Sequence, residues 1–395
     1  MRKICLSVVG LVLTLFSAYA QSPAKDSSKY QPRKLTFEEA NLVSSYYHQN
    51  GNNSAVTGGI GTEKLSDYSG IIDVKFYKWD RKERKHNFIL EAGIDHYTSA
   101  SSDKVDLAAN SSASSADTRI YPSLAWSMEN DKKGKTFGAG ISTSTEFDYQ
   151  SFGGNVSFAQ KTRNRNGEFA VKLAGYADNL KYILPVELRT GNGEDYSSKS
   201  RNSYSSSFSY SQIVNQRLQL MFLLDLVYQK GYLGLPFHRV YYNDNSVHRE
   251  ELPSSRFKIP IGFRANYFVG DNIIVRSFYR YYHDDWGINA HTIDLETAVK
   301  INPFFSVAPF YFFFTQSAAD YFAPYQQHTV ADIYYTSNYD LSKFNSNFYG
   351  AGFRITPPKG VFGFSHFNML ELRYGHYTKT TGMKADIVSL NLKFK

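Results

Sequence analysis

The sequence predicts an all-β protein, a transmembrane antiparallel up-and-down β-barrel of about 16 strands, with 14–16 as the range. Three observations predict this fold. Apolar and polar residues alternate over many stretches, and successive side chains of a strand point to opposite faces. Several of these stretches contain 10 or more residues, about the ~9–11 that a tilted strand needs to cross a bilayer. The connections between them alternate between short and long, as in outer-membrane barrels.

The clearest alternation lies in the hairpin of residues 256–286. Apolar or aromatic residues occupy every second position from 257 to 267, and a similar face follows the turn at 269–272. The opposite face of both runs carries the most concentrated charge in the chain: Arg256, Lys258, Arg264, Arg276 and Arg280. One face is suited to lipid and the other to water, which is the pattern of a membrane barrel with a polar lumen.

The bulk composition excludes other classes. The chain has 395 residues with 31 Tyr and 30 Phe, and its mean hydropathy is −0.41. A helical membrane protein would contain apolar runs of about 18 or more residues, and none occurs after the N-terminus. Nucleic-acid binding is not expected either, because the basic residues are spread through strands and turns instead of clustering on one face.

The N-terminus has the features of a secretory signal peptide. Arg2 and Lys3 precede an apolar stretch at 6–16, and Ala18-Tyr19-Ala20 forms a small-x-small cleavage site. Residues 1–20 are therefore expected to be removed, which lowers the formal charge from +8 to +6. The only cysteine leaves with this segment, so no cysteine metal ligand is expected and no cofactor is predicted.

Residues 21–53 are predicted to form a periplasmic N-terminal segment before the barrel, which would occupy residues 54–395. Thr36 and Glu39 fit a capping box, and Phe37, Ala40 and Val43 follow at helical spacing, so a short helix is one interpretation. A partly ordered leader is the other.

Sixteen candidate strands follow. They cover residues 54–63, 68–79, 87–98, 118–128, 135–146, 150–161, 167–178, 203–214, 217–230, 255–268, 272–285, 289–301, 304–316, 346–356, 364–378 and 384–395. Pro122, Pro260 and Pro309 lie inside these strands, where each removes a ladder donor and indicates a bulge or a misplaced boundary.

The connections sort by length. Those after even-numbered strands are short, whereas those after odd-numbered strands include every long one: 99–117, 179–202, 231–254 and 317–345. Short periplasmic turns alternating with longer external loops are typical of outer-membrane barrels. The sequence therefore predicts the outer membrane of a Gram-negative bacterium, with membrane lipid and the barrel-assembly machinery as partners.

Two stretches resemble a known family: residues 44–63, which contain the segment AVTGGIGTE, and residues 144–151. From about residue 40 to the C-terminus the chain is similar to Gram-negative outer-membrane barrels that carry a domain-of-unknown-function label. That resemblance implies a barrel and no assigned activity. It also implies a small lipoprotein as a partner and a link to extracytosolic flavin chemistry, because such barrels tend to be encoded beside a lipoprotein and a flavin-attaching enzyme.

Each candidate site also has a plainer interpretation. The five basic residues of the hairpin could give a pore an anion preference, but any hydrated lumen needs charges, and Asp294, Glu296 and Glu371 could neutralise them. Glu146 with Asp148, and the 283–285 triplet, could bind calcium, although solvated turns are the preferred interpretation.

Other patterns carry less chemistry. Gly58, Gly59 and Gly61 lack the Lys-Ser/Thr of a phosphate loop and are expected to relieve crowding or mark a bulge. Aromatic groups near the external loops are expected to form interface girdles, with a ligand platform as the alternative: Tyr279, Tyr281, Tyr282, Tyr241, Tyr242, Tyr321, Phe322, Tyr325, Tyr334 and Tyr335. No Gly-x-Ser-x-Gly elbow is present, and no enzyme is predicted.

The leading functional prediction is a small-solute channel or a transport or export component. The alternative is a closed barrel that anchors or docks a periplasmic or lipoprotein partner.

Overall fold

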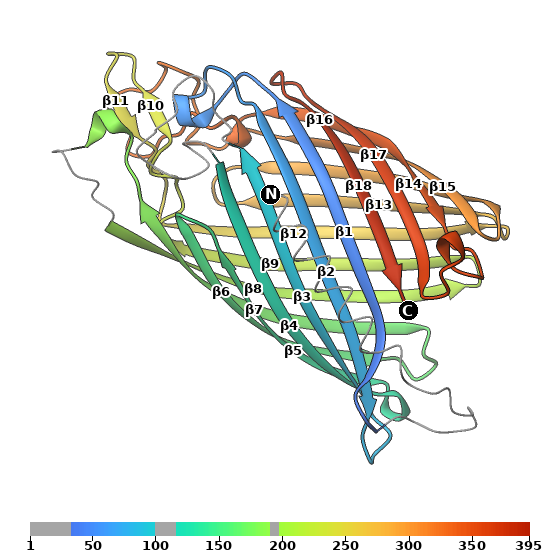
Figure 1. Ribbon diagram of the computed structural model, residues 1–395. Coiled ribbons are helices and arrows are strands. Elements are labelled where there is room, and N and C mark those ends of the chain that lie inside the picture. Colours follow the sequence, from blue (N-terminus) through green and yellow to red (C-terminus); the bar gives the residue numbers. More distant parts are fainter. Residues whose placement is uncertain (1–32, 99–115, 190–196) are drawn as a thin grey trace.

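The structure is a computed structural model that describes residues 33–98, 116–189 and 197–395. The predicted signal peptide lies outside the described residues. Within them, 16 strands close into one barrel in which every neighbouring pair is antiparallel (Figure 1). The predicted fold class and strand number are therefore confirmed.

The strands follow one another around the barrel in chain order, and β1 pairs with β18 to close it. Their bounds are β1 (Thr36–Asn50), β2 (Leu65–Trp79), β3 (Lys85–Thr98), β4 (Ala116–Asn130), β5 (Lys135–Thr145), β6 (Tyr149–Lys161), β7 (Gly167–Tyr182), β8 (Ser197–Asn215), β9 (Leu218–Gly231), β12 (Ser255–Val269), β13 (Ile273–Asp284), β14 (Asn289–Asn302), β15 (Phe305–Gln316), β16 (Phe344–Ile355), β17 (Phe367–Lys379) and β18 (Lys384–Phe394). A separate hairpin, β10 (Arg239–Tyr241) and β11 (Val247–Arg249), lies in the connection between β9 and β12.

The first strand differs from its prediction. Residues 36–50 form β1 instead of a periplasmic helix, and the predicted strand 54–63 is part of a loop. Hydrogen bonding explains both errors. β1 forms hydrogen bonds with the otherwise unpaired edges of β18 and β2, which a helix could not do. Gly58, Gly59 and Gly61 have φ near +80° and cannot continue a strand. The barrel thus begins at Thr36, not at residue 54.

The prolines inside strands lie where the ladder is interrupted. Pro122 is in register with Ala92 of β3, but pairing between β4 and β5 skips from Ile120 to Ser123. Pairing between β12 and β9 passes over Pro260, and pairing between β14 and β15 passes over Pro309. Each missing N–H thus faces a neighbour that is locally unpaired, but the register is the same on both sides of each gap, so the interpretation as bulges is wrong.

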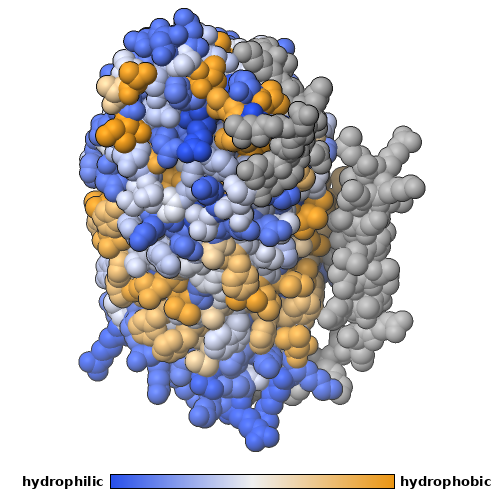
Figure 2. Space-filling view, turned by 90° about the vertical axis from the view of Figure 1, so that its left-hand side faces the viewer, coloured by the Kyte–Doolittle hydropathy of each residue, from blue (hydrophilic) through white to orange (hydrophobic). Residues whose placement is uncertain are grey.

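The alternation of loop length is confirmed. One end of the barrel carries only compact turns, the longest at 356–366, and the other end carries 51–64, 232–254 and 317–343. Alternate residues of each strand face outward, and those outward residues include many exposed apolar side chains, such as Leu90, Ile141 and Phe222. Figure 2 shows them as a hydrophobic band on one face, with hydrophilic residues below it and a mixed surface above.

A closed antiparallel barrel with such a band satisfies every requirement of lipid: the backbone is paired within the ring and the outer surface is apolar. The protein is therefore an outer-membrane β-barrel, with short periplasmic turns and longer external loops. Among the described residues, no helix combines the length and apolar character that a membrane crossing would need.

Candidate functional site

Four external connections pack together over the barrel mouth, and we call them the external cap: residues 51–64, 183–189, 232–254 and 317–343. Two of them, 232–254 and 317–343, are tied by single β-bridges, Tyr242 with His328 and Glu251 with Tyr335. Figure 1 shows these segments gathered at one end of the barrel, around the β10–β11 hairpin.

The cap crosses the mouth from side to side. Loop 51–64 joins β1 and β2, whereas loop 232–254 joins β9 and β12, and six strands separate the two loops in either direction around the barrel. Contacts between these loops therefore span the full width of the mouth.

Arg239 of β10 is the central contact of the cap, with a side chain only 4% exposed. Its Nε donates to Glu187 at 2.5 Å and its Nη2 donates to the same carboxylate at 3.0 Å. Its Nη1 donates to the carbonyl oxygen of Val56 at 2.8 Å. One guanidinium thus joins three connections, and the bidentate geometry suits arginine and not lysine.

The glycines of the family-like segment fit against this contact. A Cβ on Gly58 would lie 2.5 Å from the ring of Tyr241, and a Cβ on Gly59 would lie 2.6 Å from the carbonyl oxygen of Ser337. Both residues also have positive φ. The prediction that these glycines relieve crowding is confirmed, but the crowding arises between loops of the cap and not in a strand.

Glu250 is a second buried contact. Its carboxylate accepts from the hydroxyl of Thr336 at 2.5 Å and from the N–H of Leu235 at 2.8 Å. His238 Nδ1 lies 3.6 Å away. Burial alone would raise the pKa of Glu250, but these groups outweigh it and hold the pKa below its usual value.

Most of the loop tyrosines pack inside the cap. The ring of Tyr241 is tilted against that of Tyr325 with centroids 4.9 Å apart, and Tyr242 meets Tyr335 edge-on at 5.2 Å. The girdle interpretation is wrong for these groups, because loops long enough to fold over the mouth bury their aromatics against one another. Tyr279, which faces outward from β13 and is exposed, fits the girdle.

Among the described residues the buried core lies in this cap, and these residues do not fill the lumen beneath it. Most buried side chains, including Val240, Thr336 and Trp286, belong to the cap or to the external ends of strands. Along β5, β6 and β8 the inward positions are mostly small and keep partial exposure: Gly138, Gly140, Ser142, Ser144, Ser151, Asn155, Ser157, Ser203, Ser205, Ser207, Ser209 and Ser211. Small polar residues that no core covers line a space for water.

The five basic residues predicted to face the lumen all do so, on β12 and β13. Two of them are neutralised. Arg256 donates to Asp284 from Nε at 2.9 Å, and Arg276 pairs with Glu296. No described residue forms an ion pair with the other three: Lys258, Arg264 and Arg280.

Sequence reasoning missed an acidic group on the opposite wall. Asp67, Asp73 and Glu91 face inward from β2 and β3, and no described residue forms an ion pair with them. Asp73 accepts from the amide of Asn41 at 2.7 Å. Six strands separate this pair of strands from β12 and β13 in either direction, so the two charged walls face each other. Only the closing register could reveal this arrangement.

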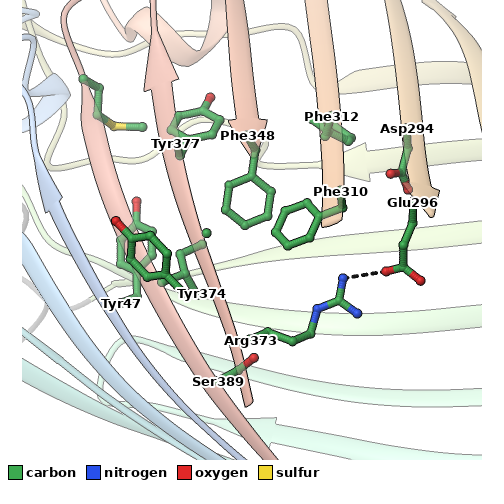
Figure 3. Close-up of a pocket in the computed structure, with 13 residues that line it drawn as sticks. Tyr47, Asp294, Glu296, Phe310, Phe312, Phe348, Arg373, Tyr374, Tyr377 and Ser389 are labelled. Carbon is green, nitrogen blue, oxygen red and sulfur yellow. Dashed lines mark hydrogen bonds and ion pairs between the residues drawn. The ribbon is translucent and has the colours of Figure 1, made fainter. Parts of the chain in front are cut away.

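A recess of about 660 Å³ opens on the lumen wall formed by β14 to β18. Figure 3 shows Phe310, Phe312, Phe348 and Tyr377 around it, with Asp294 and Glu296 at one side. A smaller cavity of about 300 Å³ adjoins it, shares both carboxylates and adds Arg264 and Arg276.

An ion-pair network forms the floor of the recess. Arg373 donates to Glu296 at 2.6 Å and to Glu371 at 3.3 Å, and its guanidinium lies 5.0 Å from the ring centroid of Phe310. Arg354 also pairs with Glu371, from Nε at 2.7 Å. Of the acids predicted to neutralise the basic residues of the hairpin, Glu296 pairs with Arg276, whereas Glu371 pairs with Arg354 and Arg373 and no described residue forms an ion pair with Asp294.

The two acidic groups weighed for calcium have different environments. Asp284 is fully buried and accepts from Arg256 and from the N–H groups of Trp286 and Ile288, which makes it a structural residue of its turn. Glu146 and Asp148 lie with Asp117 at the external rim, with carboxylate oxygens within 4.8 Å of one another. Burial, followed by the charges of Glu146 and Asp117, raises the pKa of Asp148 to about 6.

Solved structures similar to this chain include a BenF-like porin, OpdK and a siderophore receptor. A BenF-like porin from Pseudomonas fluorescens Pf-5 is 8% identical, with 92% of this chain and 100% of that chain covered and a TM-score of 0.45. OpdK of Pseudomonas aeruginosa, solved with vanillate, is 7% identical, with 92% and 99% covered and a TM-score of 0.42. The siderophore receptor PirA from Acinetobacter baumannii is 12% identical, with 87% and 53% covered and a TM-score of 0.45. Likenesses at these scores lead to no conclusion about a solute or an activity of this chain.

No match was found among the curated proteins. A family model described as a protein of unknown function (DUF3570) matches residues 86–381, well over half of the chain. The matched residues do not include the AVTGGIGTE segment, so the match is independent of it. The chain belongs to the DUF3570 family.

Proposed function

We propose that the protein is an outer-membrane channel for small solutes whose external mouth is controlled by the cap. The observation that carries this proposal is a lumen that the described residues leave unfilled beneath the cap and line with small polar side chains and with unpaired charges on opposite walls. Burying unpaired charges costs several kcal/mol each unless water reaches them. Asp73, Glu91, Arg264 and Arg280 are therefore compatible with the fold only if the lumen holds water.

The cap supplies the control. Its loops are held together by a few buried polar contacts and not by the barrel ladder, so they can separate without opening a strand pair. Local opening of loops costs less than global unfolding. The cap is therefore the element that we expect to limit conductance.

Planar-bilayer recording tests the proposal with a matched pair of variants. Arg239→Ala removes the contact between three loops, whereas Arg249→Ala alters its register partner in β11, a half-exposed residue paired with Glu251. We expect wild type and Arg249→Ala to show small or rare conductance steps, and Arg239→Ala to show larger or more frequent ones. Silence from correctly folded Arg239→Ala would contradict a channel.

A second function has its own supporting observation. In the longest periplasmic turn, Phe362 and Phe364 are 79% and 68% exposed, and Phe362 holds a strained positive φ of 54°. A strained backbone that projects an exposed aromatic residue is compatible with a docking surface. The alternative function is therefore a scaffold for a periplasmic or lipoprotein partner. The link to flavin chemistry stays a prediction. Cysteine crosslinking from position 362 in cells tests it, and an unchanged pattern in Phe364→Ser would argue against this surface.

A further inference from the structure

One row of inward side chains crosses six strands of the lumen wall. The strand registers place in line Arg264 of β12, Phe278 of β13, Asp294 of β14, Phe312 of β15, Phe348 of β16 and Tyr377 of β17. Each pair of neighbours in the row lies on adjacent strands, about 4.7–4.9 Å apart in the pairing direction. The row therefore has two charges at one end and three aromatic rings at the other.

The two charges stand close without pairing. The guanidinium of Arg264 lies 5.3 Å from the ring centroid of Phe278, the residue between it and Asp294. No ion pair joins Arg264 to Asp294, and no other described residue forms one with either. Both line the same small cavity. An unpaired cation and an unpaired anion facing one cavity can each bind the opposite charge of a single ligand.

The aromatic end of the row is the wall of the larger recess. Phe310 and Phe348 lie with ring centroids 5.1 Å apart, and Phe312 and Tyr377 flank them (Figure 3). Arg373 does not offer a free charge here, because Glu296 and Glu371 share it. A volume of about 660 Å³ with aromatic walls and a few polar groups is typical of a small-molecule site.

Resting on the channel function above, we propose that this row binds a small zwitterion with an apolar, ring-sized side chain. The ammonium group would contact Asp294, the carboxylate would contact Arg264, and the side chain would enter the recess among Phe312, Phe348 and Tyr377. A simple anion would leave the carboxylate of Asp294 unpaired beside a negative ligand. A simple amine would leave the guanidinium of Arg264 unpaired beside a positive ligand. A zwitterion alone satisfies both charges.

Isothermal titration of the folded wild-type barrel in detergent micelles tests the ligand class without any variant. The four probes are phenylalanine, 2-phenylethylamine, 3-phenylpropionate and glycine. Since a charge-assisted contact contributes about tenfold or more in affinity, we expect phenylalanine to bind at least about tenfold more tightly than the others. If 3-phenylpropionate or 2-phenylethylamine bound as tightly as phenylalanine, the ligand would not need to be a zwitterion. If glycine bound as tightly as phenylalanine, the recess would not bind the side chain. Either result would overturn the proposal.

Variants then assign each end of the site. Asp294→Asn should weaken the binding of phenylalanine about tenfold and should not weaken the binding of 3-phenylpropionate. Arg264→Gln should weaken the binding of phenylalanine and should not weaken the binding of 2-phenylethylamine. Phe348→Leu should weaken the binding of phenylalanine and leave the binding of glycine unchanged. Arg280→Gln is the matched control, because Arg280 is an unpaired arginine on the same wall outside the row. A loss in Arg280→Gln as large as that in Arg264→Gln would overturn the assignment.

The titration separates this proposal from the channel. Binding by a barrel that never conducts would keep the site and contradict the channel. Conductance with no binding of phenylalanine would keep the channel and overturn the site.

Discussion

At the scale of single residues, a few side chains decide whether loops pack over the mouth. Gly58 has a positive φ and its missing Cβ is replaced by the ring of Tyr241. Gly270, in a periplasmic turn, has a positive φ of 63° but open space around it. Comparing the two glycines therefore distinguishes the cost of a positive φ from the cost of a steric clash when a Cβ is added.

We expect Gly270→Ala to lower the free energy of unfolding by about 1 kcal/mol, the usual cost of a left-handed backbone for alanine. Gly58→Ala should cost clearly more, because it places a Cβ only 2.5 Å from a carbon of the Tyr241 ring. It should also expose the cap loops to protease. Midpoints of heat-induced unfolding on gels and limited proteolysis measure the two effects, and equal costs would contradict the role of Gly58 in the cap.

Asp148 provides a pH dependence at the external rim. Its pKa is raised from 3.8 to about 6, chiefly by burial and then by Glu146 and Asp117. The folded state therefore binds more protons than the unfolded chain between these values, so stability falls as pH rises through this window and is level above it. Asp148→Asn should flatten the dependence of the unfolding midpoint between pH 4 and 7. Asp271→Asn, in an exposed turn at the other end, is the matched control.

At the scale of elements, each strand separates lipid from water by alternation. On β9, Phe222 is 55% exposed on the outer surface and pairs with Phe263, whereas Leu223 pairs with Gly262 on the lumen side. Depth is nearly equal for these two neighbours, and only the direction of the side chain differs.

A charge on the lipid side of β9 should therefore be far more costly than one on the lumen side. Phe222→Arg should lose on the order of 2–4 kcal/mol, the usual cost of arginine near the bilayer midplane, and Leu223→Arg should lose little. Leu223 serves better than Met221 because Met221 lies opposite Arg264, where a second arginine would be repelled. The fraction of heat-modifiable barrel on gels reports the difference, and a larger loss in Leu223→Arg would mean that the register is slipped by one residue.

At the scale of the whole molecule, closing the ring sets an acidic wall opposite a basic one. Asp67, Asp73 and Glu91 face Lys258, Arg264 and Arg280 across the lumen. Such walls act on permeating ions mainly within a Debye length, about 10 Å at 0.1 M salt.

Neutralising one wall should therefore change ion selectivity in a direction set by its sign. The triple variant Lys258→Gln, Arg264→Gln and Arg280→Gln should shift the reversal potential toward cation preference. The triple variant Asp67→Asn, Asp73→Asn and Glu91→Gln should shift it toward anion preference. Recordings in a salt gradient, made in the Arg239→Ala background if the cap limits current, measure both shifts. Shifts of the same sign would show that the walls do not line the conducting path.

The sequence by itself determined the barrel, because lipid and water impose a period of two on every strand and sort the loops by length. It therefore predicts that Arg256, Lys258, Arg264, Arg276 and Arg280 share one face of their hairpin, and the strand register places them on one face. It could not determine β1, because apolar residues at 36–50 recur at helical spacing. The strand forms because the closed ring leaves free edges on β18 and β2 that β1 pairs with.

Only the tertiary structure decided which side chains meet in the cap and along the lumen. The contact of Arg239 with Glu187 and Val56 joins residues far apart in the chain, and nothing in their local sequence indicates it. The row from Arg264 to Tyr377 likewise arises from five strand registers, each fixed by hydrogen bonds between strands and not by any one segment. Period-two alternation determines which way a side chain faces, but only the closed, registered sheet determines which side chains it meets.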